Sequence, residues 1–432
     1  MIRGMKGYKS RIFDALLCDA LEAKGAVLVE GAKWCGKTTT AEQIAKSVLY
    51  VNDPKHREQY LATAQTNPQR LLSGDNPRLI DEWQIAPELW DAIRFDVDHS
   101  DTDGKFVLTG SAVPLDEEAK KKIHHSGTGR FAWIRMRPMS LFESLESSGT
   151  VSFGGLFAGK RSLGDAKPHT LEEMAFLTCR GGWPKATGKS GKAALRQAFD
   201  YVDAVVGTDI SRVDEVTRDP DLALRIMKSL ARLQGTQSSV AAIKADLAPN
   251  APNGGVHENT VYSYVGALKK IFVVEDMSAW CPNLRCKTPV RTTDTRYFTD
   301  PSIATAALGL GPDGLMDDLK TFGLLFETLV ARDLRTYAAA NDGKVAHYRD
   351  KSGLECDAVM HLRNGRYGLI EVKLGGSKLI AEGRAKLNRL ASEIDTQTMK
   401  DPAFRMIVVA EGDFAYEETD GTLICPIGCL GP

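Results

Sequence analysis

Short apolar stretches alternate with amphipathic stretches along the first third of the chain. The apolar stretches predict strands at residues 26–29, 47–51, 79–81, 106–108 and 131–136. Helices are predicted at residues 11–24, 38–46, 59–64 and 87–97. Such alternation is typical of a parallel sheet covered by helices, so we predict an α/β domain over residues 1–150. A stretch rich in Gly and Ser, residues 149–164, marks its expected end.

The pattern becomes mostly helical from residue 171 to about residue 276. Two helices, at 238–247 and 257–269, are joined by a loop at 249–255 and followed by a strand at 271–275, which is the order of a winged helix. A packing module without nucleic-acid contact is the alternative, because only Lys269 and Lys270 add charge to the second helix.

Beyond residue 300 the pattern changes again. It predicts a helix at 322–337 and paired strands at 348–363 and 367–373. The sequence therefore divides into three predicted parts, residues 1–150, 151–300 and 301–432.

Composition narrows the class of protein. A chain of 432 residues is too long for one core, and 43% apolar with 26% charged residues is ordinary for a globular protein. The net charge of −1 gives no overall attraction to nucleic acid or to an anionic membrane. The basic N-terminus lacks the apolar stretch of a signal peptide, and no stretch is long enough to span a bilayer. We expect a soluble cytoplasmic protein without a membrane partner.

Residues 31–38 read GAKWCGKT, a complete G-x-x-x-x-G-K-[ST] loop between a predicted strand and a predicted helix. In that context backbone N–H groups surround a phosphate at a helix N-terminus. The glycines permit close backbone approach, Lys37 is expected to reach the β- and γ-phosphates, and the Thr38 hydroxyl to ligate Mg²⁺. The alternative is a glycine-rich turn that fits by chance. The predicted nucleotide-binding residues are Gly31, Ala32, Lys33, Trp34, Cys35, Gly36, Lys37, Thr38 and Thr39.

Further polar residues follow the later strands of this domain. Asp81 is expected to hold Mg²⁺ through water, and Glu82 to polarise the attacking water. Thr109 or Ser111 is expected to contact the γ-phosphate or to orient water, unless the strand simply ends in a turn. Arg130 precedes the last strand and is expected to reach the γ-phosphate of its own or a neighbouring subunit. The second of these roles would require a homo-oligomer. A solvated surface arginine is the alternative.

A second group of polar residues lies in the C-terminal part. In the sequence EVK, Glu371 and Lys373 point to the same face of a strand, and Asp357 lies on the adjacent predicted strand. Two carboxylates and an amine can thus converge on one Mg²⁺ or Mn²⁺. Residues 344–400 contain eleven Lys or Arg and seven Asp or Glu, an excess that favours a phosphate partner. An ordinary surface strand end is the alternative.

The segments YVND, LIDEWQIAPELWDAI, FVLTGSA and GRFAWIRMRPMSLFE resemble the AAA+-type ATPase domain of a large prokaryotic family. The resemblance continues through GGWPKA, VVGTDISRV, RYFTDPSIA and LLFETLVARDL and covers nearly the whole chain. It implies that Lys37 and Thr38 are Walker A residues, Asp81 and Glu82 Walker B residues, Thr109 sensor 1 and Arg130 the arginine finger. Trp34 and Cys35 depart from the pattern, because small or polar residues are usual there.

The family's C-terminal half is a domain of unknown function. Here Asp357, Glu371 and Lys373 resemble the PD-(D/E)xK core of restriction-endonuclease-like nucleases. The resemblance implies that the carboxylates bind the metal and that the lysine helps to activate water. Glu327, in the helix before the strands, matches the position of that fold's extra helical acid.

Two hypotheses of function remain open. In the first, a Mg²⁺-dependent, AAA+-type ATPase drives or gates a transaction on DNA or RNA through its restriction-endonuclease-like C-terminal domain, with or without cleavage. In the second, the protein is a nucleotide-controlled switch that binds another protein, and the C-terminal domain is a catalytically silent docking module.

Overall fold

The computed structural model describes residues 7–111, 127–161, 163–214, 216–248, 255–282, 294–395, 397 and 399–432. These residues form two compact units, each considered by itself. The first lies within residues 1–138, 207–218 and 266–272, and the second within 139–206, 219–265 and 273–432. The division at residues 150 and 300 stays a prediction, and the two units follow other bounds. In the described part of the chain, no helix combines the length and apolarity needed to cross a membrane.

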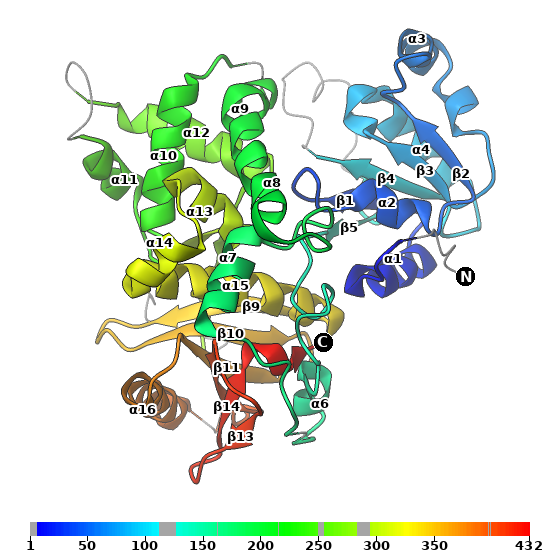
Figure 1. Ribbon diagram of the computed structural model, residues 1–432. Helices are drawn as coiled ribbons and strands as arrows, with labels where there is room; N and C mark the ends of the chain where they lie inside the picture. Colours follow the sequence, from blue (N-terminus) through cyan, green and yellow to red (C-terminus); the bar gives the residue numbers. More distant parts are fainter. Residues whose placement is uncertain are drawn as a thin grey trace. The chain divides into compact units, whose positions relative to one another are not determined.

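The first unit contains a five-stranded sheet in the order β2-β3-β4-β1-β5, and every neighbouring pair is parallel. The strands are β1 (Ala26–Glu30), β2 (Ser47–Tyr50), β3 (Arg78–Asp81), β4 (Phe106–Gly110) and β5 (Phe131–Arg135) (Figure 1). The predicted parallel α/β sheet is therefore confirmed. Because the strands are parallel, their carboxyl ends lie along one edge of the sheet.

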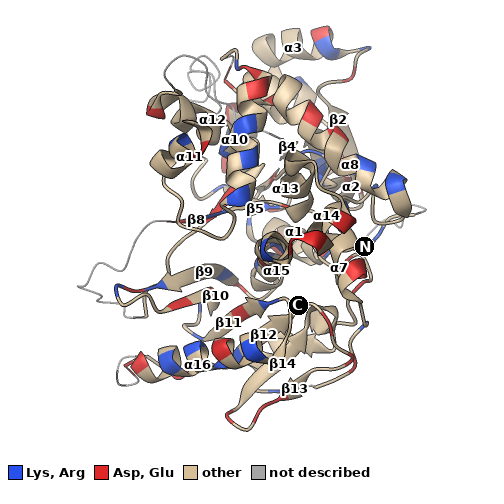
Figure 2. Ribbon diagram, turned by 60° about the vertical axis from the view of Figure 1, so that its left-hand side comes forward, with Lys and Arg blue, Asp and Glu red and all other residues tan. Residues whose placement is uncertain are grey.

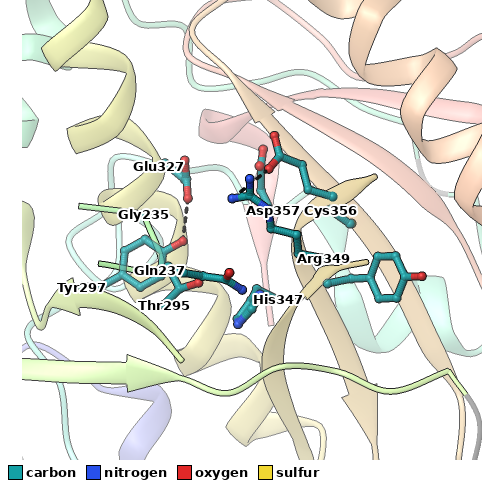
Figure 3. A pocket seen from close by; sticks show the side chains of 11 residues that line it. Gly235, Gln237, Thr295, Tyr297, Glu327, His347, Arg349, Cys356 and Asp357 are labelled. Carbon is teal, nitrogen blue, oxygen red and sulfur yellow. Dashed lines mark hydrogen bonds and ion pairs between the residues drawn. The ribbon is translucent and has the colours of Figure 1, made fainter. Parts of the chain in front are cut away.

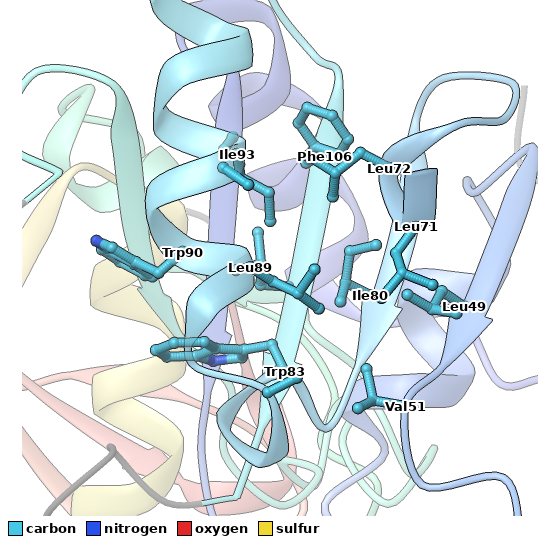
Figure 4. Close-up of a cluster of buried hydrophobic side chains, with 14 of the residues drawn as sticks. Leu49, Val51, Leu71, Leu72, Ile80, Trp83, Leu89, Trp90, Ile93 and Phe106 are labelled. Atoms are coloured by element: carbon cyan, nitrogen blue, oxygen red, sulfur yellow. The ribbon is translucent and has the colours of Figure 1, made fainter. Parts of the chain in front are cut away.

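Helices cover both faces of this sheet. They are α1 (Ile12–Ala23), α2 (Lys37–Glu42), α3 (Arg57–Thr66) and α4 (Glu88–Asp98), with short 3₁₀ turns η1 (Pro68–Leu72) and η2 (Trp83–Ile85). Figure 4 shows Leu89 and Ile93 of α4 packed with Ile80 and Phe106 of the sheet. The opposite face packs against α1 through another buried cluster, which includes Leu17. One face alone could not bury the apolar residues on both sides of β1.

The end of α2 differs from the prediction. The helix ends at Glu42, whereas the sequence pattern extended it to residue 46. The Lys46 N–H donates to the Pro77 carbonyl at 2.8 Å, so the chain has already turned toward the start of β2.

The second unit begins with a largely helical region, as predicted. Its helices include α6 (Phe153–Phe157), α7 (Leu171–Arg180), α8 (Gly191–Ala204), α10 (Pro220–Arg232), α11 (Val240–Leu247), α13 (Pro301–Leu308) and α14 (Pro312–Asp317). The helix α12 (Glu258–Lys270) precedes a two-stranded antiparallel ribbon of β7 (Val274–Met277) and β8 (Thr295–Phe298). The predicted strand thus starts at residue 274 rather than 271. The predicted loop at 249–255 lies outside the described residues except for Gly255, and the winged helix stays a prediction.

The second unit also contains a six-stranded mixed sheet in the order β13-β14-β12-β11-β10-β9. Its strands are β9 (Gly343–Arg349), β10 (Glu355–Leu362), β11 (Tyr367–Lys373), β12 (Arg405–Val409), β13 (Tyr416–Glu417) and β14 (Thr422–Pro426). The helices α15 (Leu319–Ala340) and α16 (Ser377–Glu393) pack on it (Figure 1). A short pair, β6 (Val151–Ser152) with β15 (Leu430–Gly431), joins the predicted boundary segment to the end of the chain.

The predicted strand at 348–363 is wrong at its start. Tyr348 and Arg349 end β9, and a turn separates them from β10. The Asp350 carboxylate closes this turn by accepting the Leu354 N–H at 2.9 Å. Residues 349–353 read RDKSG, a polar stretch with a glycine that is typical of a turn, so the prediction missed a local signal.

A buried ion cluster joins distant segments of the second unit. Only 1% of the Arg332 side chain is exposed, and it lies 2.9 Å from Asp300 and 2.8 Å from Asp333. Asp300 also accepts the Gly182 N–H, and Asp333 accepts the Leu141 N–H, both at 2.9 Å. Both carboxylates therefore depend on one guanidinium for their charge balance.

We expect Arg332→Met to destabilise the protein by about 3–5 kcal/mol, because it leaves two buried carboxylates without a counter-ion. Urea unfolding of the full chain measures this loss. The matched control is Arg389→Met, since Arg389 forms an exposed i,i+4 pair with Glu393 and its loss should change the stability little. Equal losses in the two variants would show that the buried cluster has no special weight.

Candidate functional site

The predicted phosphate loop lies at the carboxyl edge of the first sheet, between β1 and α2. Gly31 has φ +152°, and a Cβ there would lie 2.1 Å from the Met136 carbonyl oxygen. Gly36 has φ 106° and immediately precedes α2. The two glycines therefore allow backbone geometry that other residues would not. Trp34 nevertheless has a positive φ of 67° with its side chain 45% exposed, while Cys35 is fully buried.

The Lys37 side chain is buried and folds back over the loop. Its ammonium donates to the carbonyl oxygens of Gly31 at 2.8 Å and Ala32 at 2.9 Å. Neither of these two acceptors carries a negative charge. An anion brought to the loop would therefore find an available cation.

Two predicted residues, Thr38 and Thr109, both contact a third, Asp81. Its carboxylate oxygen Oδ1 accepts the Thr38 hydroxyl at 2.7 Å and the Thr109 hydroxyl at 2.6 Å. Asp81 and Thr109 are direct partners in the β3–β4 register, and Thr38 lies in the first turn of α2. Carboxylate and hydroxyl oxygens are the ligands that Mg²⁺ prefers, so Thr38 and Asp81 fit this ion.

Glu82 follows directly and has an unusual backbone, with φ 55°. Burial, and then the neighbouring Asp81, raises the pKa of the Glu82 carboxyl. The Gln84 amide donates to this carboxylate at 2.5 Å. A Cβ at Gly110 would lie 2.6 Å from Gln84 Oε1, so the glycine after Thr109 leaves room for the amide. Sequence reasoning missed Gln84, and only its place beside the acidic pair could have drawn attention to it.

Arg130 is not brought to the loop of its own chain. Its carbonyl accepts the Ala26 N–H at the start of β1, whereas the loop follows the end of that strand. A five-residue strand spans about 15 Å. The Arg130 guanidinium is 47% exposed and lies 2.5 Å from Asp98. A role in its own site is therefore not supported, and a role in a neighbouring subunit stays a prediction.

Two segments remote in sequence belong to the same unit and contact this edge. Lys33 of the loop lies 2.5 Å from Asp209, in the segment 207–218. Arg135, at the end of β5, lies 5.0 Å from the centre of the Phe272 ring and 3.8 Å from Glu30. Sequence reasoning identified neither contact, because no local pattern links these segments.

In the second unit, three predicted residues meet on β10 and β11. The Lys373 ammonium lies 2.7 Å from Glu371 Oε2 and 3.3 Å from Asp357 Oδ2. Asp357 also accepts the Val372 N–H at 2.8 Å. The alternating direction of strand side chains, which predicted one face for Glu371 and Lys373, is therefore confirmed.

Glu327 lines a pocket with Asp357 (Figure 3). The Tyr297 hydroxyl donates to Glu327 Oε1 at 2.5 Å, and a Cβ at Gly235 would lie 2.7 Å from the same oxygen. Burial, and then the Asp357 charge, raises the pKa of Glu327 well above its ordinary value. Burial likewise raises the pKa of Tyr297, which keeps the hydroxyl a donor. Tyr297 and Gly235 come from remote segments and carry no sequence signal for this site.

Glu371 is completely buried, and its Oε1 has no hydrogen-bond partner among the described residues. Burial, and then the charge of Asp357, raise the pKa of Glu371 to about 8, against the opposing effect of Lys373. Within the described ranges, no three His, Cys, Asp or Glu side chains form a group that could hold a metal ion. The second Mg²⁺ or Mn²⁺ therefore stays a prediction that rests on Asp357 and Glu371.

The local excess of basic residues is partly neutralised by the fold. Figure 2 shows acidic and basic residues together along α16. Arg384 pairs with Glu418 and Asp420, and Lys386 pairs with Glu355. The attraction for phosphate that the sequence suggested is therefore weaker than the count of charges implied.

Three family models match successive parts of the chain. Residues 23–145 match a model described as an AAA domain. Residues 171–314 and 322–430 each match a domain of unknown function, DUF8612 and DUF4143 respectively. The first match covers the parallel sheet and its loop, and together with their geometry it supports an ATP-binding, AAA+-type P-loop domain in the first unit.

Proteins that are similar over most of the chain do not identify its activity. Uncharacterized proteins of Mycobacterium bovis and Mycobacterium tuberculosis are each 24% identical over 417 residues, which cover 95% of this chain and 82% of theirs. Among solved structures, a Walker-type ATPase of Pyrococcus abyssi is 17% identical, covering 71% of this chain and 97% of its own, with a TM-score of 0.44. The ORC2 protein of Aeropyrum pernix, solved as ADPNP–ADP complexes, is 13% identical over 74% and 92%, with a TM-score of 0.29. These scores do not establish a shared overall fold.

We expect Glu371→Gln to stabilise the protein at high pH in the presence of EDTA. Because the folded-state pKa of about 8 exceeds the ordinary 4.5, the wild type loses stability as pH rises between these values. The amide carries no such penalty, so the variant should be more stable by about 1 kcal/mol or more at pH 9 and nearly equal at pH 4. Urea unfolding across this range measures the difference. A difference that does not change with pH would contradict the assigned shift.

Proposed function

We propose that the protein is a Mg²⁺-dependent ATPase whose turnover is coupled to a nucleic-acid transaction. The observation that carries the ATPase assignment is the meeting of Thr38, Thr109 and Asp81 beside a loop that already presents the buried Lys37. A chance glycine-rich turn would have no reason to place the Thr38 hydroxyl, in the first turn of α2, against groups at the carboxyl ends of β3 and β4.

Each group has a definite role in this proposal. The loop N–H groups and Lys37 bind the phosphates, and Thr38 and Asp81 would hold Mg²⁺. The ion, when bound, would neutralise charge on the phosphates. Glu82 accepts a proton from the attacking water, and its raised pKa makes it a stronger base than an ordinary carboxylate. The Gln84 amide donates to only one oxygen of Glu82, so it can orient the carboxylate while the other oxygen accepts the proton.

Arg130 has a role only in an oligomer. Its exposed guanidinium lies at the edge opposite the loop, where a neighbouring copy can present a γ-phosphate to it. We therefore assign Arg130 as an arginine finger that acts across a subunit interface.

We expect Lys37→Ala to lose detectable binding of ATP, because no other group replaces the buried ammonium. Glu82→Gln should still bind ATP but turn it over at least about a hundredfold more slowly, since the proton acceptor is lost. Calorimetry with a non-hydrolysable ATP analogue and a phosphate-release assay measure the two effects separately. Lys24→Ala is the control, because Lys24 donates to Gly129 near the amino end of β5. Normal turnover in Lys37→Ala would refute the assignment.

The C-terminal cluster favours a phosphodiester as the second substrate. Glu371 Oε1 is buried without a described partner, and Lys373 provides a cation beside the two carboxylates. Asp357 and Glu371 would hold a divalent ion, and Lys373 would bind a phosphate oxygen. The restriction-endonuclease-like fold and a winged helix formed by α11, α12 and the β7–β8 ribbon belong to this part of the proposal.

We expect single-stranded or duplex DNA or RNA to be cleaved in the presence of Mn²⁺, with a rate that depends on ATP. Asp357→Asn should lose the cleavage because it weakens binding of the divalent ion, and Lys373→Met should lose it because it removes the cation that binds the phosphate. The control is Lys378→Met, which changes an exposed lysine of α16. If no nucleic acid is cut or bound, the alternative function of a nucleotide-controlled protein-binding switch is favoured instead.

A further inference from the structure

Lys33 is a charged residue of the phosphate loop to which the mechanism above gives no role. Its ammonium lies 2.5 Å from Asp209 Oδ1. The Lys33 side chain is 43% exposed, whereas that of Asp209 is 11% exposed. Lys33 also lowers the pKa of Glu82 through its charge, although less than Lys37 does. The Lys33 ammonium is therefore close enough to Glu82 for the two charges to interact.

Asp209 lies in a segment whose backbone is ordered by polar contacts. It ends the π-helical turn η3 (Val205–Asp209) and precedes the short helix α9 (Ile210–Arg212). The buried Arg218 donates to the Ile210 carbonyl at 2.7 Å and to both oxygens of Asp214 at 2.6 and 2.9 Å. Single π-helical turns are rare and are frequent at functional sites. The position of the Asp209 carboxylate is thus built into the fold.

The two loop lysines differ in what they must give up to bind a phosphate. Lys37 leaves neutral carbonyl groups, whereas Lys33 leaves a carboxylate. The γ-phosphate of ATP adds negative charge at the loop, and this charge can attract the Lys33 ammonium that now pairs with Asp209. ADP brings no such charge.

We propose that Lys33 binds the γ-phosphate and that Asp209 is a positioning residue that competes for its ammonium, so that the site distinguishes ATP from ADP. This inference rests on the proposed ATPase function. When Lys33 turns to the phosphate, Asp209 loses its counter-ion. The segment 207–218 then senses which nucleotide is bound.

The test is calorimetric titration of the full chain with ADP and with a non-hydrolysable ATP analogue, each with Mg²⁺. Lys33→Met should weaken binding of the analogue about tenfold and leave ADP binding within about twofold, because only the γ-phosphate contact is lost. Asp209→Asn, which keeps the side-chain shape, should tighten binding of the analogue about threefold without affecting ADP, since the competitor is neutralised. The double variant should behave as Lys33→Met, because Asp209 acts only through Lys33.

Lys24→Met is the control for removal of a lysine from the same unit. Equal changes for ADP and the analogue would mean that Lys33 only shapes the loop, and weaker binding in Asp209→Asn would mean that Asp209 does not compete. Either result overturns the inference while leaving the ATPase proposal intact. A wild-type chain that binds neither nucleotide overturns both.

Discussion

The candidate nucleotide site depends on the parallel pairing of β1 with β4 and of β4 with β3. Parallel strands end at the same edge, so the phosphate loop after β1 lies beside the carboxyl ends of its neighbours. The register adds the remaining precision, because Asp81 and Thr109 are direct partners. A shift of one residue would turn these side chains to opposite faces and separate the hydroxyl from the carboxylate.

Residues from remote segments also contact this edge of the sheet. Asp209 reaches Lys33, and Phe272 packs against Arg135, each from a segment far along the sequence. Residues 207–218 are flanked in sequence by parts of the second unit. If Lys33 exchanged Asp209 for another partner, the changed contact would therefore lie in a stretch of chain whose sequence neighbours belong to the second unit.

Local motifs explain what could be predicted from the sequence. The loop and the five strands of the first sheet are encoded in continuous stretches, and the spacing of Glu371 and Lys373 reports their shared face. Contacts between remote segments have no such signature. Neither the Tyr297 hydroxyl on Glu327 nor the Asp209 carboxylate on Lys33 could be inferred from a pattern. The break between β9 and β10 did have a local signal, the polar stretch RDKSG at residues 349–353, which the prediction missed.

The most direct test of this account is a structure of the chain with a non-hydrolysable ATP analogue and Mg²⁺. The distance to measure joins the Lys37 ammonium to its acceptors. We expect the ammonium to leave the carbonyl oxygens of Gly31 and Ala32, now 2.8 and 2.9 Å away, and to contact a phosphate oxygen, with Thr38 and Asp81 at the metal. A nucleotide bound elsewhere, or a Lys37 that keeps its carbonyl partners with nucleotide in the loop, would contradict the account.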